Sequence, residues 1–352
     1  MKTPGVRRGL PILLLLLAAC APPLVRLTAS SKSIEWKRIG LPFDVGGSLL
    51  QPVWLYNPAT SSVFVGANTK GLFESKDGGD SWSRVDDGSF VTSSVNTGFH
   101  TLQSGPNGIL YSIDIVSGLY TSENGGRHWT KAFPLNTTKS RVWVDIDPDR
   151  PADVYLATTN WTESEPSDSC FDLRRSTNAG ASFERVDIPA CKVVSVDVVG
   201  RLVCYSIAQT IRCSDNGTAW QALSLKPIAD SMAIDQTLNA HVELTINKTN
   251  RELVILSGGK LHETRNGRTT IARMTAGRTI DLVFDPHRTF PAYGISHPDT
   301  EGPWKLSKIA SSGEMESYAG PKPIGFRLNA VDFARDTFYV WTGEGTYRGV
   351  LK

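Results

Sequence analysis

One eight-residue pattern recurs along the chain and constrains the fold more than any other feature. Residues 75–82 read SKDGGDSW and residues 122–129 read SENGGRHW, while residues 176–183 (STNAGASF) keep the pattern with one glycine replaced. A shorter copy, SDNGTAW, occupies residues 214–220, and residues 264–267 (TRNG) are a remnant. The aromatic residues that end the four longer copies are 47, 54 and 37 residues apart, a spacing that suits one four-stranded blade per copy.

The residue types of this pattern are those of a tight turn. Asp or Asn at the third position accepts hydrogen bonds from backbone amides inside the turn, and glycine adopts the positive φ angles that such turns need. A short strand-like run precedes the first copy at Gly71–Glu74, and another follows it at Trp82–Val85. We therefore expect the pattern to be the hairpin between the third and fourth strands of a blade, with its final aromatic residue packed between neighbouring sheets.

The pattern resembles the Asp-box (BNR) repeat of sialidases, sortilin-type receptors, some xyloglucan hydrolases and the photosystem II assembly factor family. The resemblance covers most of the mature chain in repeat pattern. It implies an all-β fold, a single β-propeller, in which the turn is structural and lies on the face away from the ligand site. Counting strands along the chain gives seven four-stranded blades. The sixth has no recognisable copy of the turn, so six or eight blades remain open.

The two ends of the chain indicate how the ring of blades closes. Gly345–Gly349 has the pattern of a third strand, but the chain stops at Lys352 without a fourth strand. Glu35–Ile39 has the pattern of a fourth strand with no blade before it. We expect this N-terminal strand to pair with Thr346–Val350 and to complete the C-terminal blade, because that pairing removes open sheet edges.

The N-terminus has the pattern of an export signal. Three basic residues precede an apolar run at Leu10–Leu17, which is too short for a membrane-spanning helix of roughly 20 residues. The sequence LAAC, which ends at Cys20, resembles the lipobox of bacterial lipoproteins. We predict a signal peptide over residues 1–19, a lipidated Cys20 with a tether over residues 20–32, and the propeller over residues 33–352.

The charge of the mature chain does not point to nucleic acid as a partner. The full chain has 37 basic and 35 acidic residues, and three of the basic ones leave with the signal peptide, so the mature chain is close to neutral.

Ala21, which follows the lipobox, is not the Asp that retains lipoproteins in the inner membrane of enterobacteria. We expect a monomer in the cell envelope, anchored by its N-terminal lipid to the outer membrane or the cell surface.

Four cysteines remain besides the lipidated Cys20, an even number that suggests two disulfides in an exported protein. Cys204 and Cys213 flank a predicted hairpin centred on Ala208–Gln209, where they would form a non-hydrogen-bonded cross-strand pair. The second bridge would then join Cys170 and Cys191. A zinc site is the competing interpretation, but the sequence contains no CxxC pair, so we predict no metal.

The sequence shows no recognisable catalytic chemistry. It contains no nucleophile motif, phosphate-binding glycine loop or zinc-type histidine pair. Asp145–Asp149 resembles a calcium loop but lacks the glycine and the distal Glu of an EF-hand, so we interpret it as a strand end followed by a turn. The Phe/Tyr-Arg-Ile-Pro signature of sialidases is absent, since residues 37–40 read KRIG. We therefore predict no catalytic residue and no cofactor.

Candidate ligand-binding residues stand near the beginning of the innermost strands. The strands can be aligned on a terminal Asn or Asp, at Asn57, Asp147, Asn247 and Asp285. Gln51 and the basic residues Arg141, His241 and Arg278 stand six or seven residues earlier, and Lys192 and Arg327 take equivalent places. The low-dielectric walls of the propeller would concentrate the electrostatic field of such a ring of basic residues, so the mouth would attract an anion. The alternative is that these basic residues are ordinary solvent-exposed residues at strand ends, with no role in ligand binding.

Two long loops open on the same predicted mouth and contribute Trp161 and Trp304 as further candidates. Together these features favour a membrane-tethered, non-enzymatic binding scaffold whose mouth engages a protein or glycan. The alternative is a carbohydrate-active enzyme, such as a divergent sialidase-like glycoside hydrolase. An acidic pair that reaches the mouth at a separation of roughly 5–9.5 Å would favour the hydrolase.

Overall fold

The computed structural model describes the segments that carry the strands. They are residues 27–28, 32–44, 52–67, 70–90, 99, 101–114, 117–135, 141–159, 171–187, 195–199, 202–207, 210–215, 217, 219–224, 243–247, 253–257, 260–265, 268–272, 278–285, 289–297, 303–311, 314–321 and 326–352. No helix in these segments is long and apolar enough to cross a membrane. The elements found in them are all β-strands.

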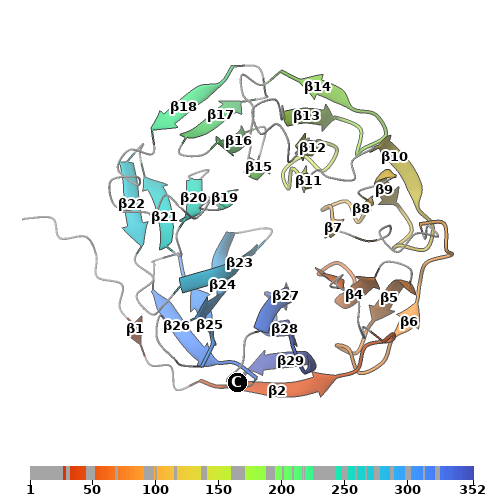
Figure 1. Cartoon of the computed structure of the whole chain (residues 1–352), viewed down its shortest axis with the longest axis vertical. Coiled ribbons are helices and arrows are strands. Elements are labelled where there is room, and N and C mark those ends of the chain that lie inside the picture. Colours follow the sequence, from red (N-terminus) through yellow and green to blue (C-terminus); the bar gives the residue numbers. More distant parts are fainter. Residues whose placement is uncertain are drawn as a thin grey trace, which may run out of the picture.

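Seven sheets are present in the described segments, six with four antiparallel strands and one with a short fifth strand added, and they stand around a common axis as the blades of a β-propeller (Figure 1). We number the blades 1 to 7 in chain order, starting at Val53. Blade 1 consists of β3 (Val53–Asn57), β4 (Ser62–Ala67), β5 (Gly71–Ser75) and β6 (Ser83–Arg84). Blade 2 consists of β7 (Thr101–Ser104), β8 (Leu110–Asp114), β9 (Gly118–Ser122) and β10 (Thr130–Pro134). Blade 3 consists of β11 (Arg141–Ile146), β12 (Val154–Thr159), β13 (Phe171–Ser176) and β14 (Glu184–Val186).

The remaining blades continue the same order from the axis outward. Blade 4 consists of β15 (Ser195–Val199), β16 (Leu202–Ile207), β17 (Thr210–Asp215) and β18 (Gln221–Ser224). Blade 5 consists of β19 (Glu243–Ile246), β20 (Leu253–Ser257), β21 (Lys260–Arg265) and β22 (Arg268–Ala272). Blade 6 is built on β23 (Arg278–Asp285), β24 (Thr289–His297), β25 (Lys305–Ile309) and β26 (Met315–Ala319). Blade 7 consists of β27 (Phe326–Asp332), β28 (Thr337–Thr342), β29 (Gly345–Leu351) and, from the other end of the chain, β2 (Ile34–Ile39).

The predicted closure of the ring is confirmed. β2 is antiparallel to β29, with Glu35 opposite Val350 and Ile39 opposite Thr346. The backbone amide of Lys352 also donates to the carbonyl of Ser33, at 2.9 Å. First and last strands therefore share one sheet, and each protects an edge that the other would leave open.

A two-residue strand lies outside this regular scheme. β1 (Leu27–Thr28) falls within the range that the sequence assigned to the tether, and it pairs in parallel with β26. Leu27 is opposite Met315 and Thr28 is opposite Glu316. Blade 6 is thereby extended by a fifth strand at its outer edge.

The recurring eight-residue pattern forms the same turn in blades 1, 2 and 3, which we call the repeated turn. In residues 75–82, the Ser75 hydroxyl donates to Asp77 Oδ1 at 2.8 Å, and the amide of Gly79 donates to Ser75 Oγ at 2.7 Å. The amide of Ser81 donates to Asp77 Oδ1 at 2.9 Å, which closes the turn. The same set of bonds recurs in residues 122–129 and in residues 176–183.

The third copy shows why glycine prevails in the turn. Gly78 and Gly125 have φ angles of 76° and 71°, and Ala179 takes the equivalent place with a φ of 57°. A left-handed φ is unfavourable for a residue with a Cβ atom, by roughly 1–2 kcal/mol. The hydrogen bonds of the turn therefore hold Ala179 in a conformation that its own preference opposes.

The aromatic residues of the pattern pack between blades, as predicted. The indole NH of Trp82 donates to the carbonyl of Gly40 (2.8 Å), and that of Trp220 donates to the carbonyl of Asp187 (3.0 Å); both carbonyls directly follow the outer strand of the preceding blade. Trp36 makes the equivalent bond to Ala319, at 3.0 Å. Trp129 instead donates to Gly126 of its own turn, at 3.0 Å.

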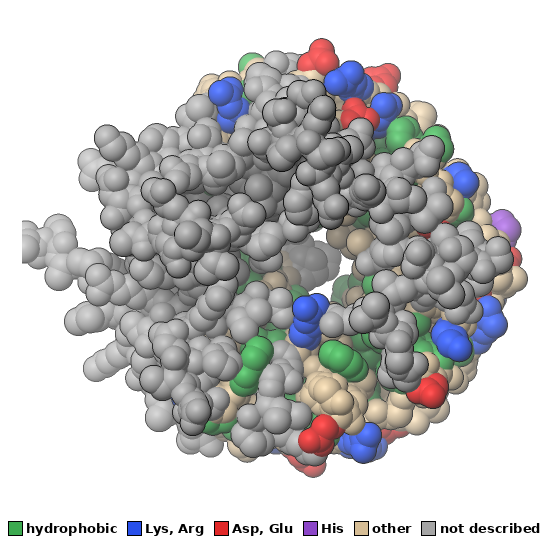
Figure 2. Space-filling view, viewed as in Figure 1, with side chains coloured by type: hydrophobic (Ala, Val, Ile, Leu, Met, Phe, Trp, Pro, Cys, Tyr) green, Lys and Arg blue, Asp and Glu red, His purple; other side chains and the backbone are tan. Residues whose placement is uncertain are grey.

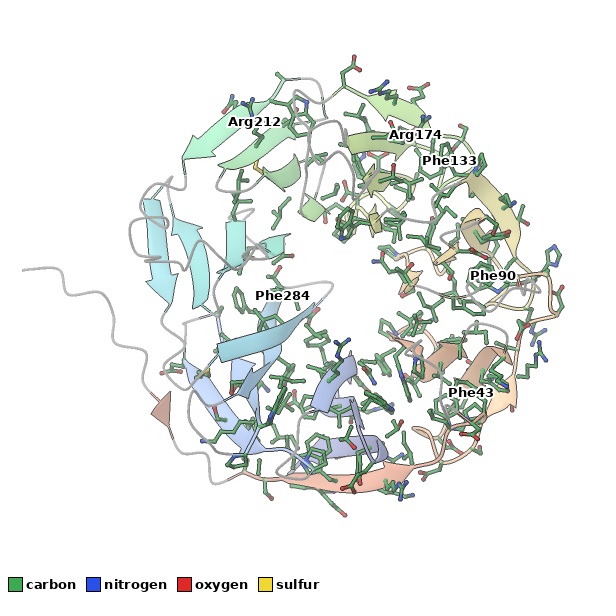
Figure 3. The ribbon with its side chains drawn as sticks, viewed as in Figure 1. Phe43, Phe90, Phe133, Arg174, Arg212 and Phe284 are labelled. Atoms are coloured by element: carbon green, nitrogen blue, oxygen red, sulfur yellow. A yellow bond between two sulfur atoms is a disulfide. The ribbon has the colours of Figure 1, made fainter. Side chains whose placement is uncertain are left out.

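The hydrophobic core is divided into clusters that join neighbouring blades. One cluster takes Phe64 and Leu72 from blade 1 and Leu110 and Trp129 from blade 2, around the buried Phe90 of the connecting segment. Figure 3 shows Phe90 and Phe133 in the spaces between successive blades. Each sheet is therefore stabilised through its neighbours, and a break at one blade removes packing from two.

The contact between blades 6 and 7 combines the bond of Trp36 to Ala319 with a second set of bonds from a hairpin of blade 7. Asp336, in the hairpin between β27 and β28, accepts hydrogen bonds from Tyr293 and from Lys308 of blade 6. The Lys308 ammonium lies 2.9 Å from Asp336 Oδ2. Burial, together with the Asp336 carboxylate, raises the pKa of the Tyr293 hydroxyl far above its usual range, so this residue stays protonated and donates.

The predicted hairpin disulfide is present between Cys204 and Cys213. The two residues are directly opposite each other in β16 and β17, with their Cα atoms 4.2 Å apart, close to the spacing of a non-hydrogen-bonded pair. Cys170 and Cys191 lie outside the described residues, and their bridge stays a prediction.

Replacing both Cys204 and Cys213 with Ala should lower the free energy of unfolding by about 2–3 kcal/mol, because the bridge closes a short loop of the unfolded chain. Urea unfolding of the variant and the parent protein measures the difference. Peptide mapping without reductant should recover Cys204 linked to Cys213. Free thiols at these positions, or a bridge from either to Cys170 or Cys191, would contradict the hairpin pairing.

Candidate functional site

The innermost strand of each blade lines the axis of the propeller. β3, β7, β11, β15, β19, β23 and β27 stand at the inner edge of their sheets (Figure 1). Because each sheet is antiparallel and is built in the same order, these strands all point toward the same end of the axis. The repeated turns, which follow the third strands, lie at that end too. The beginnings of the innermost strands define the opposite mouth.

Two of the residues that align the innermost strands, Asn57 and Asp147, have the same structural role. Asn57 Oδ1 accepts the amide of Ala59 at 3.0 Å, and Asp147 Oδ1 accepts the amide of Asp149 at 3.0 Å. Asp332 makes the same bond in blade 7. These residues are buried and close the hairpin to the second strand, because an Asx side chain holds such a turn locally.

The calcium-like segment at Asp145–Asp149 is part of this arrangement. Asp145 and Ile146 end β11, and the bond from Asp149 to Asp147 forms the turn, as the sequence indicated. In the part of the chain that the structure describes, no group of three or more His, Cys, Asp or Glu side chains is placed to hold a metal ion.

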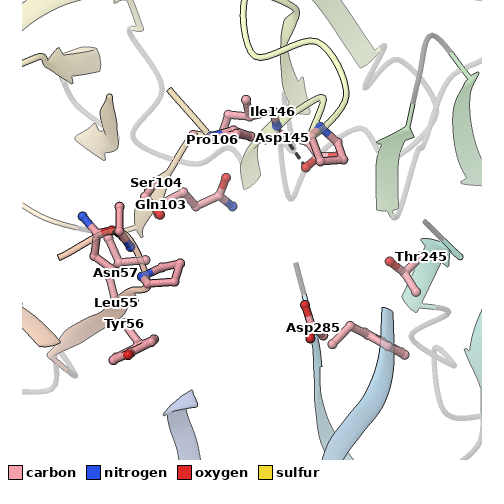
Figure 4. Close-up of a pocket in the computed structure, with 15 residues that line it drawn as sticks. Leu55, Tyr56, Asn57, Gln103, Ser104, Pro106, Asp145, Ile146, Thr245 and Asp285 are labelled. Carbon is pink, nitrogen blue, oxygen red and sulfur yellow. Dashed lines mark hydrogen bonds between the residues drawn. The ribbon is translucent and has the colours of Figure 1, made fainter. Parts of the chain in front are cut away.

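A cavity of about 620 Å³ lies at the end of the axis where the innermost strands finish. Its wall is formed by residues of β3, β7, β11, β19 and β23 and by the turns that follow β3, β7 and β11 (Figure 4). The polar side chains around it include Gln103, Asp145, Thr245 and Asp285, and Figure 4 shows them on different strands around a common space. Apolar contributions come from Leu55, Pro106, Ile146 and Phe284.

The charge of the cavity is opposite to that predicted for the other mouth. Its wall includes Asp145 and Asp285, and none of the described lining residues is Lys or Arg. Asp145 also joins two innermost strands, because its Oδ2 accepts the amide of Val198 in β15 at 2.7 Å while Oδ1 accepts the amide of Ile146 at 3.0 Å. This carboxylate therefore holds the wall of the cavity in place.

The structure places three of the predicted basic residues at the beginning of innermost strands. Arg141 and Arg278 are the first residues of β11 and β23, and Arg327 is the second residue of β27, with an exposed side chain. Along each of these strands, a basic residue at one end is followed by an acidic residue at the other. Their role in ligand binding stays a prediction.

The other candidates differ in what the structure shows. Gln51, Lys192, His241 and Trp161 lie outside the described residues. Trp304 directly precedes β25 and is partly buried, and it packs against the cluster of blades 6 and 7 that contains Tyr293 and Phe338. Packing between blades therefore accounts for most of the surface of this Trp.

Charges on the outside of the ring are mixed. Figure 2 shows Lys and Arg side chains spread around the circumference of the viewed face, with Asp and Glu between them. Other charged groups are buried and serve the fold: Asp153, which is 1% exposed, accepts a hydrogen bond from Arg175 at 2.8 Å and forms an ion pair with Arg150 at 2.9 Å. In this face the described residues form no single-sign patch that would attract a polyanion.

The cavity was not predicted as a site, although the sequence carried a signal for it. The terminal Asn and Asp residues mark where the innermost strands end. The cavity lies at this end of the axis together with the repeated turns, whereas the resemblance to Asp-box proteins places the ligand site at the other end. That Gln103, Asp145 and Thr245 share one wall depends on the closed ring, because they come from three different blades.

Comparison with known proteins identifies the fold but not a family. No family model matches the sequence, and no curated protein matches it. Among solved structures, the chain is similar to YCF48 bound to D1 peptide, with a TM-score of 0.57 and 11% identity over 93% of this chain and 98% of that one. It is also similar to the extracellular domain of the putative one component system BT4673 from B. thetaiotaomicron, with a TM-score of 0.55 and 12% identity over 89% of this chain and 40% of that one.

A third similar structure is an enzyme, the GH74 xyloglucanase from Xanthomonas campestris. Its TM-score is 0.50, with 13% identity over 82% of this chain and 50% of that one. The chain thus spans about half of the xyloglucanase and less than half of the BT4673 domain. At these identities the similarity concerns the fold, and the fold is a β-propeller.

Proposed function

We propose that the protein is a lipid-anchored, non-enzymatic β-propeller that binds a segment of a protein partner at the cell envelope. The observation that supports this most is the axial cavity, whose wall is built from the ends of β3, β7, β11, β19 and β23. Its volume of about 620 Å³ falls within the usual range for binding sites, roughly 300–1,000 Å³. A wall made of strand ends in a closed ring is rigid, which favours recognition over conformational change.

The inner edges of the blades suit a peptide as the ligand. Among the described strands, each innermost strand has a ladder partner on one side only, so some of its backbone amides and carbonyls face the axis, while others, such as the amide of Val198, bond to a neighbouring blade. Such groups, together with the amide of Gln103 and the hydroxyl of Thr245, are of the kind that bind a polypeptide backbone. The similar structure of YCF48 contains a bound D1 peptide, which is consistent with a peptide-binding role for this fold.

The proposal of a scaffold, rather than a hydrolase, is supported by how Asp145, one of the two described carboxylates of the cavity, is used. Asp145 accepts two backbone amides and joins β11 to β15. A carboxylate with this role fixes the wall. The glycoside hydrolase remains the second hypothesis, and incubation of the purified mature protein with xyloglucan and with sialyllactose tests it directly. Release of sugar from either substrate would overturn the non-enzymatic proposal.

Site-specific crosslinking in the native envelope tests where a partner binds. A photoreactive residue at Gln103 reports on the cavity, one at Arg327 reports on the opposite mouth, and one at Glu184 on the outer strand β14 is the matched control. We expect a discrete protein adduct from Gln103 and none from Glu184, and an adduct from Arg327 alone would place the partner at the opposite mouth and not in the cavity. Equal adducts from all three positions, or none from the two axial positions, would contradict binding at the axis.

Cys20→Ala should release the protein from membranes into the soluble fraction, because it removes the proposed site of the lipid. Fractionation of cells that express the wild type and the variant measures the change, and mass spectrometry of the wild type should show an acylated N-terminus. A variant that stays on the membrane, together with a wild type that carries no acyl mass, would show that the lipoprotein interpretation is wrong.

A further inference from the structure

The outer edge of blade 6 differs from the other outer edges in the described part of the chain. The strands β6, β10, β14, β18, β22 and β2 each end their sheet, whereas β26 is covered by β1. The pairing is parallel and joins Leu27 to Met315 and Thr28 to Glu316. Addition of a strand to an exposed edge is a common way to attach a segment, since main-chain hydrogen bonds supply the contact whatever the side chains are.

This pairing fixes how far the body of the propeller can move from the proposed lipid. Leu27 stands seven residues after Cys20. A fully extended chain spans at most 3.3–3.6 Å per residue, so this segment reaches about 25 Å. A globular domain of this size is about 50 Å across. The tether is therefore too short for all blades to be equally close to the membrane.

We propose that blade 6 is the membrane-proximal blade, and that the pairing of β1 with β26 holds the propeller on its edge at the surface of the lipid bilayer. This inference rests on the lipid anchor of the proposed function. β1 lies at the outside of the ring beside β26, and β14 of blade 3 lies across the ring from it (Figure 1). In this orientation both ends of the axis open sideways, so neither the cavity nor the opposite mouth is covered by the membrane.

Fluorescence quenching by lipid headgroups tests this orientation. The acylated protein is reconstituted in phosphatidylcholine vesicles that contain a headgroup-labelled quencher lipid. A fluorophore is attached at Glu314→Cys, beside the start of β26, or at Glu184→Cys on β14; both positions are exposed. We expect several-fold stronger quenching at position 314 than at position 184. Equal quenching at the two positions would overturn the edge-on orientation.

Two further variants separate the pairing from the length of the tether. Thr28→Pro removes an amide from β1 and should reduce the difference between the two labels, because the strand loses a donor and its pairing. Insertion of a 20-residue Gly-Ser segment between Cys20 and Leu27 should also reduce it while leaving β1 intact, since a flexible linker of about 20 residues adds roughly 25 Å of reach. Persistence of the full difference in both variants would show that β1 does not orient the propeller.

The outcomes distinguish this inference from the proposed function. If the wild type carries no acyl chain and neither label is quenched, the lipid anchor is wrong. If the protein is acylated and membrane-bound but both labels are quenched equally, the anchor stands and the orientation is wrong. Cys20→Ala, labelled at position 314, supplies the unquenched baseline.

Discussion

Deletion of residues 33–41 should give a protein that aggregates or fails to fold. The deletion removes β2, the outer strand of blade 7, and exposes the edge of β29. It also removes Ile39, which is 5% exposed between blades 7 and 1, and Trp36, which packs on blade 6. Loss of the buried Ile39 side chain costs about 2–5 kcal/mol, and the partly buried Trp36 adds to this, against a total stability of roughly 5–15 kcal/mol for a typical domain.

Calorimetry of two truncations at equal concentration measures this effect. Removal of residues 21–32 takes away, among the described strands, the two-residue β1 and should leave the melting temperature nearly unchanged. If the 33–41 deletion cannot be purified, Ile39→Ala should still lower the free energy of unfolding by about 2–5 kcal/mol. Equal melting temperatures for the two truncations would contradict the closure of the ring by β2.

Trp129→Ala should be the most destabilising single substitution in the repeated turns, with a loss of about 3–5 kcal/mol in the free energy of unfolding. Trp129 is 3% exposed, and its ring lies 5.2 Å from that of Phe90 and 5.6 Å from that of Phe99. Its removal would leave a void between blades 1 and 2. Urea unfolding, followed by circular dichroism, measures the change.

Two matched variants show whether packing causes the effect. Trp129→Phe keeps most of the aromatic contact but loses the indole bond to Gly126, so it should cost less than Trp129→Ala. Trp220→Ala should also cost less, because Trp220 is only partly buried. A loss below about 1 kcal/mol for Trp129→Ala would show that the clusters between blades do not stabilise the ring.

Much of the fold could be predicted because its signals are local in sequence. Ser75, Asp77 and Gly79 bond within one turn, so their order along the chain is enough to predict the hairpin. Cys204 and Cys213 face each other across a short hairpin, and their register also follows from local spacing. The pairing of β2 with β29 was predicted for a different reason: each end of the chain held half of a blade.

The candidate site could be predicted only in part. The sequence located the beginnings of innermost strands at Arg141, Arg278 and Arg327, because a terminal Asn or Asp marks the other end of such strands and is a local signal. It did not show the cavity at the other end, since the residues that line it belong to different blades. The bond from Val198 to Asp145 joins residues 53 positions apart, and only the curvature of the ring brings them together.

The sequence by itself determined the β-propeller, because the repeated turn dictates a hairpin and each blade must bury its faces against a neighbour. It also determined that the two chain ends meet, because an unpaired strand edge is unfavourable. The tertiary structure alone decided where Trp304 packs, which carboxylate closes the wall of the cavity, and that Leu27–Thr28 pairs with β26. These contacts depend on the angle and distance between sheets, and no local pattern of side chains encodes that geometry.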